Sequence, residues 1–218
     1  VPAKVILRAA ELKRLLVGNR DIMIRTLCLI FAFAWFTNQG ASQGDIILAA
    51  NAILMQFVTF AAFFLDGFAL AAESLIGAAV GARNHTRIKQ SVRYVFELGV
   101  VTALVLTALF WLSGGWMIDL LTNVEAVRES SRTFLWWAVL APVISVWCYL
   151  LDGIFIGATR TPEMRNAMIV SLVAFLGLWW IAVPPLGNHG LWLALHGYFV
   201  ARALSLAYSL PSIIRELR

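Results

Sequence analysis

Residues 46–80 read IILAANAILMQFVTFAAFFLDGFALAAESLIGAAV, and this stretch decides the fold. It contains only two charged residues, Asp66 and Glu73, and is longer than the about 20 apolar residues that a helix needs to cross a bilayer. Its apolar residues are continuous, whereas the strands of a membrane barrel alternate in polarity. The stretch therefore predicts a transmembrane helix that bends near Asp66-Gly67 and continues into the membrane surface.

The composition of the whole chain agrees with a membrane protein. Of its 218 residues, 61% are hydrophobic and 13% are charged, whereas soluble domains are about 45–50% apolar and about 25% charged. A globule of this size cannot hide so much apolar surface from water. Composition therefore excludes most soluble enzymes and nucleic-acid-binding proteins despite the net charge of +5, and the first expected partner is the lipid bilayer.

Further apolar runs predict an all-α, polytopic membrane protein with a bundle of six transmembrane helices. The predicted spans are residues 22–38, 46–80, 94–112, 134–158, 167–186 and 191–211. Residues 1–18 precede the spans and carry charges at helical spacing, which indicates an amphipathic segment on the cytoplasmic membrane surface. The chain is therefore divided into this segment and a transmembrane lobe over residues 19–218.

Basic residues predict the orientation of the bundle. Thirteen lie before the first span, after the second and fourth spans, or in the C-terminal tail, whereas the loops on the other side hold only Arg128 and Arg132. Because positively charged loops stay in the cytoplasm, both termini are predicted to be cytoplasmic. Tryptophans that flank the opposite loops predict an interfacial belt there: Trp111, Trp116, Trp136, Trp137 and Trp192.

Five charged residues fall within the apolar runs or at their edges, namely Arg25, Asp66, Glu73, Asp152 and Arg202. A charge at the bilayer centre costs at least about 2.5–3.5 kcal/mol, so such side chains normally face a partner or a wet cavity. A rise of about 1.5 Å per residue places Asp66 and Asp152 at similar depths, where Arg25 and Glu73 can join them. Arg202 is expected to have a structural partner.

This charge network has two interpretations. Its ion pairs can lock the helices together, or at least one carboxylate can bind or relay a cation. For the second interpretation the candidates are Asp152, Asp66 and Glu73, with Arg25 and Arg202 completing the network.

Two other patterns have both a packing and a functional interpretation. Gln56, Phe60 and Phe64 lie on the second span and are candidates for the lining of a substrate cavity, although the same surface can simply contact lipid. Gly153 and Gly157 form a GxxxG pattern, which predicts close approach of two helix backbones.

The chain lacks the patterns of most catalytic sites. It has no GxxxxGK phosphate loop, no HExxH or GxSxG motif, and its two cysteines stand apart within apolar runs. We therefore expect no enzyme activity and no cofactor or metal.

Five segments of the chain form a recognisable set: NRDIMIR (19–25), LDGFA (65–69), VWCYLLDGIFIGATR (146–160), EMRN (163–166) and GNHGLWLAL (187–195). Together they resemble the DNA-damage-inducible protein F branch of the MATE (multidrug and toxic compound extrusion) family. The resemblance extends over about residues 10–210, and the segment 146–166 is its most specific part.

The resemblance implies a transporter. MATE proteins have two six-helix lobes around a central cavity and export small organic compounds, often cationic or amphiphilic, in exchange for protons or sodium ions. Only the second lobe is matched, which implies the C-terminal half of a secondary active antiporter in a bacterial inner membrane. Its partner would be the N-terminal lobe of the same transporter, or a second copy of this chain.

The resemblance also ranks the candidate residues. In a neighbouring branch, carboxylates of the second lobe bind the cation, and Asp152 lies about where one of them falls. Asp152 is therefore the first candidate, whereas Arg25 stands where that branch has acidic residues. Two alternatives remain: a flippase for lipid-linked sugars, which would need more basic residues than Arg25 and Arg202, and a non-transporting membrane assembly subunit.

Overall fold

The computed structural model describes residues 9–216, with the side chains of residues 19–211 except that of His85. The helices of this part are α2 (Ala9–Ser42), α3 (Asp45–Gly81), α4 (His85–Leu121), α5 (Glu125–Gly157), α6 (Thr161–Leu186) and α7 (Asn188–Glu216). Six helices here are long and apolar enough to cross a membrane. The predicted all-α, six-span bundle is therefore confirmed.

The helices extend beyond the predicted spans. α3 has 37 residues, or about 56 Å, and runs through Asp66-Gly67 without interruption, whereas the hydrocarbon core of a bilayer is about 30 Å thick. Hydropathy marks only the part of a helix that lies in lipid, so it misses polar turns at the helix ends. α2 begins at Ala9 within the predicted amphipathic segment, while residues 1–8 of that segment lie outside the described residues.

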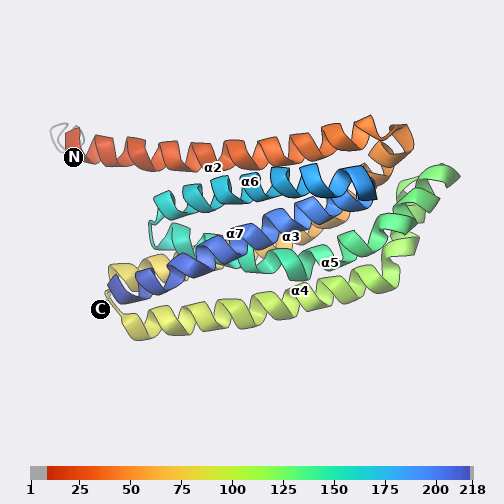
Figure 1. Cartoon of the computed structure of the whole chain (residues 1–218). Coiled ribbons are helices and arrows are strands. Elements are labelled where there is room, and N and C mark those ends of the chain that lie inside the picture. The colour runs from red at the N-terminus through yellow and green to blue at the C-terminus, as the bar shows by residue number, and fades with distance from the viewer. Residues whose placement is uncertain (1–8, 217–218) are drawn as a thin grey trace.

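Connections of one to three residues join consecutive helices, so neighbours along the chain run in opposite directions. Both described ends of the chain consequently lie at the same end of the bundle (Figure 1), which we call the terminal end. The opposite end, with the connections at residues 43–44, 122–124 and 187, is called the distal end. An even number of crossings agrees with two termini on one side of the membrane, and the cytoplasmic side remains a prediction.

The bundle consists of two three-helix groups. α3, α4 and α5 pack against one another, while α6 packs against α2 and α7. The two groups meet mainly where α5 contacts α7, and α5 is the most buried of the six spans. We call the boundary between these groups the seam.

Close backbone contact joins α3 to α5, as the GxxxG pattern predicts. A Cβ atom on Gly153 would lie 2.1 Å from the carbonyl oxygen of Ala69, and one on Gly157 would lie 2.5 Å from that of Glu73. Both distances are far below van der Waals contact, so only glycine fits at these positions. The two helices can therefore pack backbone against backbone over this part of the membrane.

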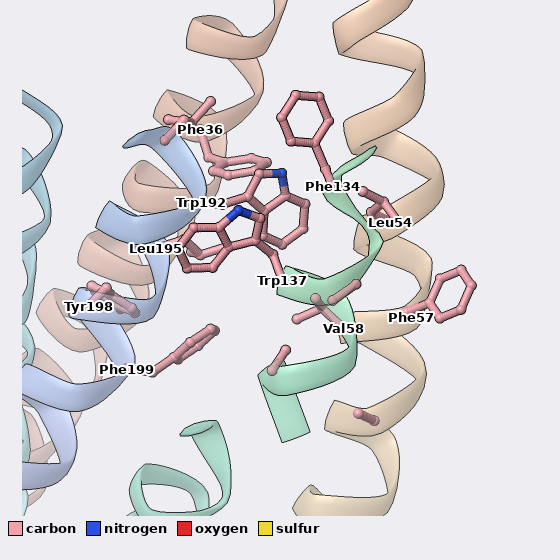
Figure 2. Close-up of a cluster of buried hydrophobic side chains, with 14 of the residues drawn as sticks. Phe36, Leu54, Phe57, Val58, Phe134, Trp137, Trp192, Leu195, Tyr198 and Phe199 are labelled. Carbon is pink, nitrogen blue, oxygen red and sulfur yellow. The ribbon is translucent and has the colours of Figure 1, made fainter. Parts of the chain in front are cut away.

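An aromatic core fills the distal half of the bundle, with Trp137 of α5 and Trp192 of α7 at its centre (Figure 2). Trp192 is fully buried and Trp137 is 8% exposed, so the prediction that these two belong to an interfacial belt is wrong. Trp111 and Trp116 do lie on the surface. Proximity to a loop indicates the height of a tryptophan along its helix, but packing decides whether its face is turned to lipid or to the core.

Candidate functional site

The intramembrane charges centre on Asp152 of α5, which is 4% exposed. Its Oδ2 accepts a hydrogen bond from Nη2 of Arg25 at 2.7 Å and also forms an ion pair with Nη2 of Arg202. Arg25 lies on α2 and Arg202 lies on α7, where it too is almost completely buried. One carboxylate oxygen therefore connects three helices.

These ion pairs connect helices that otherwise meet little. Within residues 9–216, α2 and α5 scarcely touch, so the contact of Arg25 with Asp152 is their principal link. Taking an ion out of water costs several kcal/mol, which a close opposite charge offsets in part. The structure brings Arg25 and Asp152 together as predicted, and it supplies the partner that was expected for Arg202. The lock interpretation accounts for this geometry.

Asp66 lies beside this cluster rather than inside it. It is an exposed residue of α3, and its charge interacts with those of Arg202 and Arg25 although no ion pair joins them in the described part of the chain. Gly153, which follows Asp152, contacts Ala69, three residues after Asp66. The two carboxylates therefore lie within about one helical turn of each other in height, in agreement with the predicted depths.

Glu73 is half-buried, about two turns further along α3 than Asp66. Its backbone carbonyl faces Gly157, and its side chain forms no ion pair with any described residue. The structure does not bring Glu73 to the cluster, and its role as a cation ligand stays a prediction.

The cavity-lining candidates lie on an open face of α3. Gln56 and Phe60 border a groove of about 230 Å³ that Met117 and Leu121 of α4 close on the other side. Phe64 lies one turn further on, with its ring centroid 5.1 Å from that of Phe60. Their place on the surface of this lobe is compatible with either a substrate or lipid, so the cavity role stays a prediction.

A buried amide cluster at the distal end was missed by sequence reasoning. Nδ2 of Asn51 donates to Oδ1 of Asn188 at 2.7 Å, and Nδ2 of Asn188 donates to Oδ1 of Asn51 at 2.9 Å. The same oxygen of Asn51 accepts from Nε1 of Trp192 at 2.9 Å. The available signal was the amide of Asn51 within the apolar run of residues 46–80, since a buried amide needs a partner.

Replacing Asn51 by alanine should lower the stability of the protein by about 1–3 kcal/mol, because Asn188 and Trp192 would keep buried polar groups without partners. The thermal unfolding midpoint of the full-length protein in detergent measures this loss. Asn38→Ala is the matched control, since that amide lies exposed on α2. Equal midpoints for the two variants would show that the cluster does not stabilise the fold.

Comparisons of sequence identify relatives of this chain. The MatE family profile matches residues 22–181. The chain is 45% identical over 195 residues to DNA damage-inducible protein F of Escherichia coli (strain K12), with 89% of this chain and 42% of that protein covered. It is 28% identical over 193 residues to the probable multidrug resistance protein NorM of Pseudomonas syringae pv. tomato, with 83% and 40% covered.

Solved structures show the same fold. A crystal structure of MATE in the bent conformation matches with a TM-score of 0.84 at 19% identity and covers 94% of this chain and 47% of that one. An outward-facing conformation of a multidrug resistance MATE family transporter of the MOP superfamily matches with a TM-score of 0.80 at 19% identity, over 88% and 45%. The chain spans about half the length of the proteins that it matches, or somewhat less.

Proposed function

The chain belongs to the MatE family, and from this membership we propose that it forms the C-terminal half of a secondary active antiporter. Members of the family are transporters rather than enzymes. The whole protein would export small organic compounds, often cationic or amphiphilic, in exchange for protons or sodium ions. It needs no cofactor beyond that coupling ion.

The proposed partner is the N-terminal lobe of the same transporter, which would face this lobe across a central cavity. The half-length match to MATE structures supports this arrangement, and a second copy of the chain is the alternative. We place the protein in the bacterial inner membrane as a multi-pass protein with both termini in the cytoplasm. The basic residues at the terminal end support this orientation.

The observation that carries the proposal is that Asp152 forms two ion pairs, whereas the neighbouring Asp66 forms none among the described residues. A proton or sodium ion at Asp152 would compete with the charges of two guanidinium groups, whereas Asp66 is exposed and has no ion pair among the described residues. We therefore assign cation coupling to Asp66 and an anchoring role to Asp152, the first candidate from the sequence.

Cation binding at Asp66 can be linked to a change of shape. The Asp66 carboxylate interacts with the charges of Arg25 and Arg202 on the other helix group, and a bound cation would cancel that attraction across the seam. Nε of Arg25 is buried and has no hydrogen-bond partner in the described part of the chain, so it can donate a hydrogen bond to another acceptor. A cation bound to Asp66 weakens the attraction between the two helix groups. It therefore binds with different affinities to conformations in which the groups are close together and apart, as coupling requires.

Replacing Asp66 by asparagine in the full-length transporter should reduce gradient-driven export by about 5–150-fold, which matches coupling free energies of about 1–3 kcal/mol. The measurement is efflux of ethidium, an organic cation, from proteoliposomes with an imposed pH or sodium gradient. The gradient that drives efflux in the unmodified protein identifies the ion. Glu97→Gln is the control, because the one ion pair of Glu97 among the described residues is an exposed pair with Arg93. Coupling that survives Asp66→Asn but fails in Asp152→Asn protein that is still folded would restore Asp152 as the coupling residue.

A further inference from the structure

His196 of α7 is a titratable side chain that the transport proposal does not use. It is 3% exposed, and both nitrogens of its ring lie within hydrogen-bond distance of a backbone carbonyl. Nδ1 lies 2.9 Å from the carbonyl oxygen of Trp192 on the same helix, and Nε2 lies 3.1 Å from that of Trp137 on α5. The second contact crosses the seam.

The two carbonyls distinguish the protonation states of this ring. A neutral imidazole has one N–H donor and one lone pair, whereas an imidazolium has two donors. A carbonyl oxygen can only accept, so either neutral tautomer directs a nitrogen lone pair at an oxygen lone pair. Only the protonated ring can donate to both carbonyls.

The aromatic rings around His196 also favour a cation. The ring centroid of Trp137 lies 5.1 Å from that of His196, and the centroid of Trp192 lies at 6.3 Å. A cation within about 6 Å of a tryptophan ring is attracted by the negative face of its π system, and this attraction grows when water is excluded. Burial disfavours the charged ring because it removes the surrounding water. The two carbonyls and the aromatic rings must therefore supply the stabilisation that water gives to an exposed imidazolium.

No charged side chain of the described residues contacts His196. On α5 it meets Trp137, and on α7 it meets Trp192 and Phe199. The nearest titratable groups along α7 are Tyr198, two residues later, whose hydroxyl donates to the sulfur of Met168, and Arg202, six residues later, whose charge is paired with Asp152 of α5. His189 lies about two turns earlier. The ring therefore has no carboxylate partner among the described residues, and its two carbonyl contacts favour the charged ring against the opposing effect of burial.

His189 also contacts Trp137, but it accepts a hydrogen bond from this tryptophan, whereas a protonated His196 donates one to it. Nε1 of Trp137 donates to Nδ1 of His189 at 3.1 Å, and an indole N–H can only donate, so that nitrogen carries no proton. His189 is the second residue of α7 and is half-buried. The contact of His189 with Trp137 also joins α7 to α5 across the seam.

We propose that His196 is a proton-binding site of this lobe, separate from the carboxylates of α3 and α5. The bound proton makes the ring an imidazolium that donates to both carbonyls and thereby holds α7 against α5. Loss of the proton leaves one carbonyl opposite a lone pair and weakens the contact at the seam. Because the ring is buried, the proton exchanges when the distal end opens, so proton occupancy follows the separation of these helices.

The test is ¹⁵N NMR of the full-length protein in lipid bilayers, with labelled histidine rings, at a series of pH values between about 5 and 8. Sequential assignment through the backbone of Leu195-His196-Gly197 identifies the ring without any substitution, and His196→Gln confirms the assignment by loss of the signal. His189→Gln is the matched control, since it removes the other histidine that contacts Trp137 and should leave the signals of His196 in place.

The expected result is a His196 ring with protons on both nitrogens at the acid end of the series. A ring with one protonated and one bare nitrogen at every pH would overturn the proposal. The NMR signals report the charge of the ring and not export. The proposal for His196 can therefore fail while the antiport mechanism holds, and the reverse is also true.

Discussion

Gly153→Ala is expected to be among the most damaging single-methyl additions to this protein. The added Cβ would lie 2.1 Å from the carbonyl oxygen of Ala69 and 2.7 Å from its carbonyl carbon, and helix backbone cannot move aside as a side chain can. Overpacking of a core costs about 1–3 kcal/mol, and contact with backbone places this variant at or above the upper limit. α3 and α5 would have to separate, which also displaces the neighbouring Asp152.

The measurements are the yield of folded protein in the membrane and the thermal unfolding midpoint in detergent. Gly177→Ala is the matched control, because a Cβ at that position of α6 would have no described neighbour within 4 Å. Alanine is favoured over glycine inside a helix by about 1 kcal/mol, so the control should be neutral or slightly stabilising. If both variants behaved alike, the close backbone contact would not support the fold.

Asp152→Asn is expected to be the second large effect, with a loss of about 3–5 kcal/mol of stability. The substitution removes the only negative charge that pairs with the buried Arg202 and with Arg25 in the described part of the chain. Removing one partner of a buried ion pair costs more than the pair contributes, since the remaining charge keeps its desolvation penalty. Here two guanidinium groups would remain.

Thermal unfolding of three variants separates this role from cation coupling. Asp152→Asn should unfold at the lowest temperature, and Arg25→Gln should be milder because Arg25 is partly exposed and Asp152 keeps Arg202. Asp66→Asn should unfold only slightly below the unmodified protein, since Asp66 is exposed and has no ion pair among the described residues. A loss of stability in Asp66→Asn equal to that in Asp152→Asn would contradict the division of roles between them.

Much of the architecture could be predicted from the sequence because a bilayer leaves few choices. Long apolar runs must be helices, and depth along a helix follows from residue counting, which brought Arg25 and Asp152 to the same level. Residue counting does not determine how a helix is rotated about its own axis, and this rotation decides which side chains face the core. For that reason Asp66 was expected inside the network, and Trp137 and Trp192 at the membrane interface.

Contacts between distant segments were also beyond sequence reasoning. Asn51 and Asn188 are separated by 137 positions, and nothing local to either residue indicates the other. The two ring nitrogens of His196 meet their carbonyls only because α5 and α7 pack side by side. Such pairings depend on which helices become neighbours, and short connections alone do not determine this order.

The division of the bundle into two helix groups has a mechanical consequence. Within the group of α3, α4 and α5, glycine-tight backbone contact resists sliding, since each methyl-sized shift would create a clash or a void. Across the seam, the buried contacts of Asn51, Trp137, Asp152 and His196 are polar and can exchange one partner for another. The lobe should therefore deform by shear along this internal plane, with each three-helix slab moving as a stiff plate.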